Sequence, residues 1–223
     1  MRVGIVVFPG SNCDRDMYHV LADVFGLEVT YCWHEHNLPD DLDGIVLPGG
    51  FSYGDRLRAG AIAARSPVIA DVKKMAQRSV PILGVCNGFQ ILVEAGLLPG
   101  ALLKNDSLSF MCGWTELIVN SSRTPFTSKF SKGQRVPIPV ANSEGRYYAD
   151  ADTLKEMERN DQIVFRYGDH VNGSSDKIAG VCNVEGNVVG MMPHPERAAE
   201  PEINPAGTGT TSLIFESLCG VAS

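Results

Sequence analysis

The chain has 223 residues and a formal net charge of −7. This acidic balance argues against nucleic acid or an anionic membrane as the main partner. The longest apolar runs have the length of strands, so the sequence predicts neither a signal peptide nor a transmembrane span. The length suits one large α/β domain. Because no linker-like change of composition divides the chain, we expect a single domain over residues 1–223.

The first half of the chain alternates between strand and helix patterns. An apolar strand is predicted over residues 2–8, followed by a helix that Asp14 caps and that ends near residue 26. Such alternation predicts an open parallel sheet of the flavodoxin-like type, with helices on both faces. The other elements expected here are strands over 28–33, 43–48 and 80–85, and helices over about 55–64, about 68–78 and after residue 86.

The second half changes character, because short strand patterns follow one another with turns between them. We expect an antiparallel extension of the sheet here, with one helix near 151–159 and a closing helix at about 210–219. The predicted strands are 114–120, 136–141, 162–167, 178–184 and 187–192.

The turn after the strand at 80–85 has the pattern Gly-x-Cys-x-Gly. Gly84 and Gly88 flank Cys86, and a side chain at either glycine would collide with a neighbouring strand or helix. Such a turn lifts the sulfur of Cys86 to a helix N-terminus, where free N–H groups and the macrodipole favour a thiolate. The pattern therefore predicts a nucleophile, and a buried structural cysteine between packing glycines is the alternative.

Two further segments come at the ends of predicted strands, where open parallel sheets place their functional residues. Gly49, Gly50 and Phe51 follow the strand at 43–48, and their N–H groups would serve an oxyanion or a phosphate. By itself a pair of glycines is weak evidence and more often marks a plain tight turn, but this pair follows a strand and precedes a predicted helix, where an oxyanion loop would be needed. Near residue 194, Pro195 favours an extended His194, so that His194 and Glu196 face the same region as base and orienting carboxylate.

The remaining cysteines and histidines give no sign of a metal site. The 6 cysteines are widely spaced without C-x-x-C pairs, which is typical of reduced thiols in a cytoplasmic protein. His34 and His36 lack a third ligand, so we expect a solvated polar turn there. His19 is expected on a helix surface, and His170 near the pocket without a catalytic role.

Taken together, these motifs resemble those of the class I (triad) glutamine amidotransferases. The resemblance implies that Cys86 attacks glutamine, that His194 acts as base and that Glu196 orients it. It also implies substrate binding by Gln90, and an oxyanion hole made by the N–H groups of Gly49, Gly50, Phe51 and Asn87. The segments that carry it are 9–14, 48–55, 84–90 and 192–197.

Residues 48–55 resemble the branch of this family that supplies ammonia for purine biosynthesis. That likeness implies two partners, a large ATP-dependent synthase subunit together with a small third subunit. The large partner would use ATP and Mg²⁺ to convert formylglycinamide ribonucleotide to formylglycinamidine ribonucleotide. This chain itself has no phosphate-binding or dinucleotide-binding motif, so we expect no cofactor in it. One departure is Asn142, where the branch leads us to expect histidine.

Three alternatives remain open from the sequence. The chain could serve a different synthetase. It could be a cysteine hydrolase of the intracellular-protease group, whose members resemble one another in having histidine after the nucleophile, where Asn87 stands here. It could also be a regulatory subunit with a vestigial triad, although the presence of Cys86, His194 and Glu196 argues against this.

Overall fold

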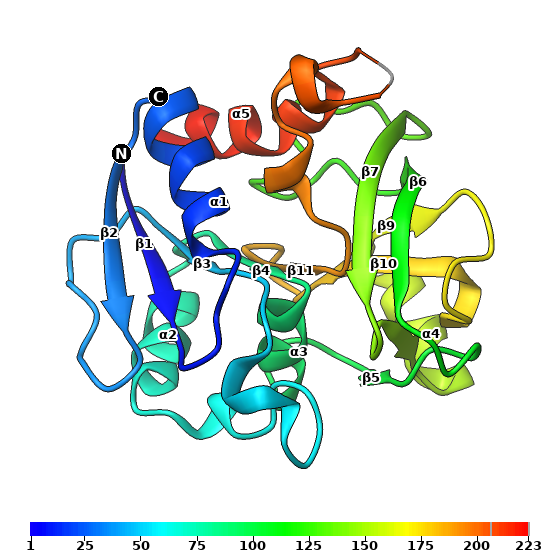
Figure 1. The fold of residues 1–223 in the computed structure, drawn as a ribbon, viewed down its shortest axis with the longest axis horizontal. Helices are drawn as coiled ribbons and strands as arrows, with labels where there is room; N and C mark the ends of the chain where they lie inside the picture. The colour runs from blue at the N-terminus through cyan, green and yellow to red at the C-terminus, as the bar shows by residue number, and fades with distance from the viewer. Residues whose placement is uncertain (206, 223) are drawn as a thin grey trace.

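The structure, a computed structural model, describes residues 1–205 and 207–222, which Figure 1 draws as a ribbon. Within these residues nine strands form one mixed sheet in the order β2-β1-β3-β4-β11-β10-β9-β6-β7, and β5 pairs with β8 in a small second sheet. The strands are β1 (Arg2–Val7), β2 (Glu28–Trp33), β3 (Gly44–Leu47), β4 (Ile82–Val85), β5 (Ala101–Leu103), β6 (Met111–Val119), β7 (Arg135–Asn142), β8 (Arg146–Tyr148), β9 (Ile163–Tyr167), β10 (Ile178–Cys182) and β11 (Val188–Met191).

The main sheet has a parallel half and an antiparallel half, as the sequence predicts. Strands β2, β1, β3, β4 and β11 are parallel to one another. From β11 onwards each neighbouring pair, through β10, β9 and β6 to β7, is antiparallel. The predicted α/β fold with an antiparallel extension is therefore confirmed.

Helices cover both faces of the parallel half. Figure 1 shows α1 and α5 on one side of these strands and α2 and α3 on the other. Strands β3, β4 and β11 are buried along their whole length, which explains their continuous apolar sequences. The α-helices are α1 (Asp14–Tyr18), which continues into the π-helical η1 (His19–Val24), α2 (Val68–Gln77), α3 (Asn87–Glu94), α4 (Ala151–Arg159) and α5 (Leu213–Cys219).

Short 3₁₀ turns fill the connections, and none of the helices within residues 1–205 and 207–222 is long and apolar enough to cross a membrane. The 3₁₀ turns are η2 (Ser52–Asp55), η3 (Ala63–Arg65), η4 (Ser175–Lys177), η5 (Pro195–Arg197), η6 (Pro201–Ile203), η7 (Thr210–Ser212) and η8 (Gly220–Ala222).

The prediction of a helix over residues 55–64 is wrong, because turns and bends connect η2 to η3 in this segment. The φ angles of Tyr53, Asp55 and Leu57 are 54°, 52° and 72°. Left-handed residues cannot propagate a right-handed helix, so the chain winds irregularly here. Strands β5 and β8 were not predicted either, since three residues each are too few to show a period.

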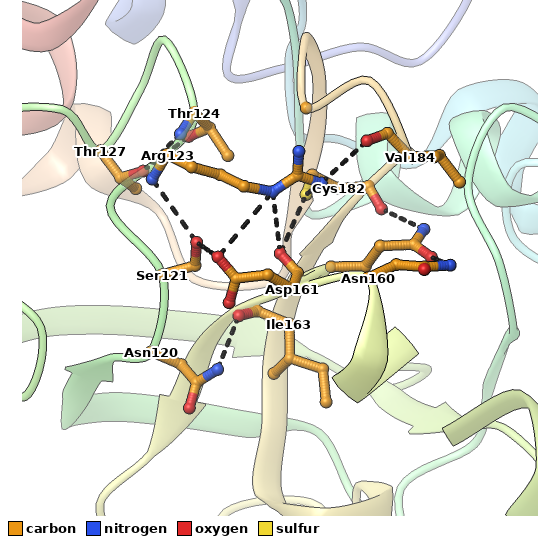
Figure 2. A network of polar contacts seen from close by, with 12 residues as sticks. Asn120, Ser121, Arg123, Thr124, Thr127, Asn160, Asp161, Ile163, Cys182 and Val184 are labelled. Carbon is orange, nitrogen blue, oxygen red and sulfur yellow. Dashed lines mark hydrogen bonds and ion pairs between the residues drawn. The ribbon is translucent and has the colours of Figure 1, made fainter. Parts of the chain in front are cut away.

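Arg123 fastens the antiparallel half of the sheet, as Figure 2 shows. Its Nε donates to the carbonyl of Asp161 (3.0 Å), before β9, and its Nη2 donates to the carbonyls of Asn183 and Val184 (both 3.1 Å). These last two residues belong to the turn between β10 and β11. The contact therefore holds the far end of the hairpin whose second strand leads to His194.

The turn between β4 and α3 is packed so closely that glycines are required. A Cβ on Gly88 would lie 1.9 Å from the main-chain oxygen of Leu47, at the end of β3. A Cβ on Gly84 would lie 2.5 Å from Leu92 Cδ1 and 2.7 Å from the Gly88 oxygen. The steric constraint predicted from the sequence is therefore confirmed. A Cβ at either glycine would overlap main-chain atoms, which can move only at a large cost in free energy.

We therefore expect Gly88→Ala to lower the free energy of unfolding by about 3 kcal/mol or more, because β3 and α3 would have to separate. Urea titration followed by circular dichroism measures this loss. Gly113→Ala is the matched control, since a Cβ there meets no atom within 4 Å. A Gly88→Ala chain as stable as the control would contradict this account of the turn.

Candidate active site

Cys86 stands at the top of the turn between β4 and α3, in a strained backbone conformation. Its φ and ψ are 51° and −105°, outside the regions that L-residues ordinarily occupy. Two hydrogen bonds hold it there: its N–H donates to the Met191 oxygen (2.8 Å), and its own oxygen accepts from Gln90 N–H (3.1 Å). Strain of this kind persists where the surroundings impose it, as nucleophiles of such turns require.

His194 follows β11 and has an extended backbone, with φ −103° and ψ 91°, as Pro195 predicts. Its Nδ1 lies 2.7 Å from Glu196 Oε1, and the two side chains are 2% and 0% exposed. Glu196 lies in the 3₁₀ turn η5 rather than in an extended stretch, and this turn still brings its carboxylate to the ring. A carboxylate at Nδ1 leaves Nε2 as the nitrogen that takes up and releases a proton.

The structure brings Cys86 and His194 together around Gly49. A Cβ built on Gly49 would lie 2.7 Å from His194 Cε1 and 3.4 Å from Cys86 Cβ, so both residues border the same small volume. Burial disfavours protonation of the ring. The charges of Glu196 and the Cys86 sulfur outweigh this effect, however, and raise the pKa of His194 well above 6.5. The imidazolium is thus stabilised at neutral pH.

The loop after β3 lies against the turn that precedes α1. Gly50 has φ 151°, and a Cβ there would lie 2.8 Å from Ser11 Cα, so only glycine fits. The Phe51 N–H donates to the Gly10 oxygen at 2.9 Å. The expectation that Phe51 donates to an oxyanion therefore does not hold in this conformation. Gly49, Gly50 and Asn87 remain the candidate donors, and as the first residue of α3, Asn87 has an N–H that the helix itself cannot satisfy.

Side chains of α3 tie this loop to the segment after β7. The Asn87 amide accepts from the Ser52 N–H (3.2 Å) and donates to Gln90 Oε1 (2.9 Å). Gln90 in turn donates to the Glu144 main-chain oxygen (2.8 Å). The Gln90 side chain is thus held at the site, and its role in binding substrate stays a prediction. The Asn87 side chain was not singled out from the sequence, where only its N–H was considered.

Two residues near the site differ from what the sequence indicated. His34 is not in a solvated turn: it is 6% exposed, packs beside Trp33, and its Nδ1 lies 3.1 Å from the Tyr53 hydroxyl. It therefore anchors the loop after β3. Cys13, for which the sequence indicated no role, has its sulfur 3.1 Å from the Cβ built on Gly49. Cys13 belongs to segment 9–14, which carries part of the family resemblance, and this was the one indication in the sequence that it lies near the site.

The remaining histidines lie at the surface. His19 pairs with Asp23 and Glu200 on the face of the α1–η1 helix, as expected, and His36 is exposed. The His170 side chain is 72% exposed and lies 2.7 Å from Asp106.

Asn142 closes β7 and is 3% exposed. Within the described residues neither its Oδ1 nor its Nδ2 has a hydrogen-bond partner. The preceding residue, Ala141, accepts a long contact of 3.7 Å from the Cys86 sulfur through its main-chain oxygen. This places Asn142 one residue from the site without a contact that assigns it a role.

We expect Glu196→Gln to lower the pKa of His194, because the ring would lose its counter-charge and burial would then dominate. A raised histidine pKa stabilises the folded state at pH values below it, so this stabilisation should also decrease at neutral pH. Titration of ¹⁵N-labelled imidazole by NMR measures the shift, and Glu202→Gln, at an exposed position, is the control. An unchanged His194 titration would contradict the assigned pairing.

Asp55, in the loop after β3, generates a pH-dependent prediction. Burial, and after it the charge of Glu144, raises the pKa of the Asp55 carboxyl to about 6. Above about pH 6 the carboxyl is ionised in both the folded and the unfolded chain, and the folded chain is destabilised because its ionised form is disfavoured. Below about pH 4 the carboxyl is protonated in both states, so this destabilisation disappears. Asp55→Asn should accordingly stabilise the chain by on the order of 1 kcal/mol near neutral pH, after allowance for solvent screening, and far less near pH 4.

Urea unfolding of Asp55→Asn at the two pH values measures this difference. Asp169→Asn, at an exposed position, is the matched control. An equal gain at both pH values would show that the effect does not come from ionisation of Asp55.

Comparison with known proteins gives a family match over nearly the whole chain. The profile of the CobB/CobQ-like glutamine amidotransferase domain matches residues 1–217. A chain in the structure of PurLQS from Thermotoga maritima is 48% identical to this chain, with a TM-score of 0.90, and the match covers 100% of this chain and 99% of that one.

More distant structures share the fold. A candidate GMP synthase protein from Thermoplasma acidophilum is 19% identical with a TM-score of 0.58, and the match covers 99% of this chain and 94% of that one. The glutaminase domain of Trypanosoma brucei CTPS, solved with bound acivicin, is 15% identical with a TM-score of 0.59, and the match covers 97% and 94%. From its matched profile and its full-length relative, the chain belongs to the family of CobB/CobQ-like glutamine amidotransferase domains.

Proposed function

We propose that this chain is the glutaminase subunit of phosphoribosylformylglycinamidine synthase. It hydrolyses glutamine to glutamate and ammonia and delivers the ammonia to a synthetase subunit. The observation that carries the proposal is the buried arrangement of Cys86, His194 and Glu196 beside Gly49. The match to PurLQS along the whole chain supports the choice of synthetase.

In the first half-reaction the Cys86 sulfur attacks the side-chain carbonyl carbon of glutamine. The C–S bond forms while His194 holds the thiol proton, and the negative charge moves to the carbonyl oxygen. The N–H groups of Gly49 or Gly50 and of Asn87 stabilise that oxygen. Removing one donor of this kind typically costs about 100- to 1000-fold in rate.

The second step breaks the C–N bond. His194 gives its proton to the departing nitrogen, so ammonia leaves and a γ-glutamyl thioester remains on Cys86. Water, deprotonated by the same ring, then attacks the thioester carbon, and glutamate leaves as the sulfur is restored. Glu196 stays ionised throughout and keeps the ring in the productive tautomer.

The ammonia has to reach an acceptor before water protonates it, so the chain requires a partner. We propose a large synthase subunit that uses ATP and Mg²⁺ to convert formylglycinamide ribonucleotide to its amidine, together with a small third subunit, in the cytoplasm. The sequence itself carries neither a G-x-x-x-x-G-K-[ST] nor a G-x-G-x-x-G motif, which agrees with a separate ATP-binding partner.

A different synthetase is the second candidate, since the fold is shared with the candidate GMP synthase protein and with the glutaminase domain of CTPS. Adding this chain to purified candidate synthetases and measuring glutamine-dependent product distinguishes the two. Product with formylglycinamide ribonucleotide as acceptor supports the proposal. Product only with another acceptor would overturn the choice of synthetase while leaving the glutaminase chemistry in place.

In the reconstituted complex, Cys86→Ala should lower glutamine-dependent synthesis by about 10⁴-fold or more, because the sulfur that forms the thioester is removed. Synthesis from added ammonia should persist, since the partner performs that step. Cys112→Ala, which removes an exposed thiol, is the control. Glutamine hydrolysis by Cys86→Ala at the wild-type rate would show that the nucleophile is assigned wrongly.

A further inference from the structure

The Cys13 sulfur lies against the His194–Glu196 pair, although the glutaminase mechanism gives Cys13 no part. Cys13 immediately precedes α1 and is 1% exposed. Its sulfur, a ring nitrogen of His194 and a carboxylate oxygen of Glu196 all lie within 4.8 Å of one another. A Cβ built on Gly49 would lie 2.7 Å from His194 Cε1 and 3.1 Å from the Cys13 sulfur. The ring is therefore bordered by Glu196, by the bare Gly49 backbone and by this sulfur.

Three hydrogen bonds fix the position of the sulfur. The Cys13 N–H donates to the Gly49 oxygen at 3.2 Å, which holds the main chain. The Cys13 thiol donates to Asn12 Oδ1 at 3.1 Å, and its sulfur accepts from Arg197 Nη2 at 3.0 Å. Because the thiol hydrogen is directed to Asn12, the lone pairs of the sulfur are left for the guanidinium and for the imidazole.

Arg197 joins the turn that carries the base to the start of α1. It belongs to η5, the turn that also holds Glu196, and its main-chain N–H donates to the His194 oxygen at 3.3 Å. Its Nε donates to Asp16 of α1 at 3.4 Å, while Nη2 reaches the Cys13 sulfur. One guanidinium thus holds together the two segments whose side chains meet at the ring.

We propose that Cys13 is a positioning residue of the glutaminase reaction: held by Arg197, its sulfur keeps the His194 ring in the orientation that serves Cys86. This role rests on the proposed function. The single hydrogen bond from Nδ1 to Glu196 still lets an imidazole swing about it. A second polar contact removes that freedom, and the position of a base has to be accurate to a fraction of an ångström.

The sulfur also favours the protonated ring. The ionisable groups described around the ring are Glu196 from η5, Cys86 from the turn after β4 and Cys13, with Arg197 acting on the Cys13 sulfur. Burial lowers the pKa of His194, whereas the charges of Glu196 and Cys86, and after them the contact with Cys13, raise it. Loss of the sulfur should therefore lower the pKa of His194, an effect that a contact which only fills space would not have.

Cys13→Ser and Cys13→Ala separate positioning from packing, because the two new side chains have nearly the same volume and differ in one polar atom. A serine oxygen can accept from Arg197, and an alanine methyl group cannot. In the reconstituted complex, Cys13→Ala should lower kcat for glutamine hydrolysis by about 10- to 100-fold with KM nearly unchanged, since a loosened base slows the reaction without weakening binding. Cys13→Ser should retain at least about threefold more activity than Cys13→Ala.

Equal kcat values for the two variants would show that the sulfur only fills space and would overturn the proposal. Cys112→Ala, at an exposed thiol, is the control for loss of a cysteine. Circular dichroism verifies that each variant is folded. If Cys13→Ala does not fold, Cys13→Ser is compared with the unmodified chain, and a kcat equal to that of the unmodified chain would contradict a role of the sulfur.

The pKa of His194 tests the same contact without partner or substrate, and so separately from the proposed function. In the chain alone, titration of ¹⁵N-labelled imidazole by NMR should give a lower His194 pKa for Cys13→Ala than for the unmodified chain, with Cys13→Ser between them. One and the same pKa in all three chains would overturn the electrostatic part of the role. Loss of glutamine-dependent synthesis in the Cys86→Ala complex tests the proposed function itself.

Arg197→Met tests whether the guanidinium acts through the sulfur, because methionine keeps a long side chain without its N–H donors. Alone, this substitution should lower kcat at least about threefold, and in the Cys13→Ala background it should add much less than that factor. Losses that multiply fully would show that Arg197 acts independently of Cys13 and would contradict the proposed support of the sulfur.

Discussion

The active site depends on the absence of a side chain at Gly49. This residue follows β3, the strand between β1 and β4, and a Cβ there would lie 2.7 Å from the His194 ring and 3.1 Å from the Cys13 sulfur. Segments from the ends of β1, β4 and β11 can meet over β3 only because this position is bare. The convergence places the base next to Cys86, at the carboxyl edge of the parallel half of the sheet, where such sheets hold their ligands.

A second close approach, between α3 and the end of β3, supports the position of Cys86. Gly88 lies against the Leu47 main chain, so α3 packs directly on the end of β3 and fixes the direction in which Cys86 points. A hydrogen bond adds a second restraint, since the Met191 oxygen accepts from the Cys86 N–H. Strain at Cys86 is thus imposed by the two neighbouring strands rather than by the turn alone. The turn, the base and the loop of candidate oxyanion donors are therefore packed against one another at one edge of the sheet.

Much of this could be predicted because its causes are local. At Gly84 the atoms that exclude a side chain belong to Gly88 and Leu92, a few residues along the chain, and Pro195 restricts His194 directly. At Gly88 the excluding atoms belong to Leu47 of β3, and only the Gly-x-Cys-x-Gly pattern indicated that constraint. The irregular segment after Tyr53 could not be predicted, since its left-handed residues include Leu57, whose type gives no warning. Two further features could not be predicted, because they arise from tertiary contacts that the periodicity of the sequence does not show. The Phe51 N–H donates a hydrogen bond to the Gly10 oxygen, and the Cys13 sulfur lies close to His194.

The central claim is that Cys86, served by His194 and Glu196, breaks the amide of glutamine through a thioester. The direct measurement is peptide mass spectrometry of the complex, mixed with glutamine and quenched with acid during turnover. The account predicts a γ-glutamyl adduct on the peptide that contains Cys86, sensitive to hydroxylamine and absent when glutamate replaces glutamine. Turnover without that adduct, or with the adduct on Cys13, would contradict it.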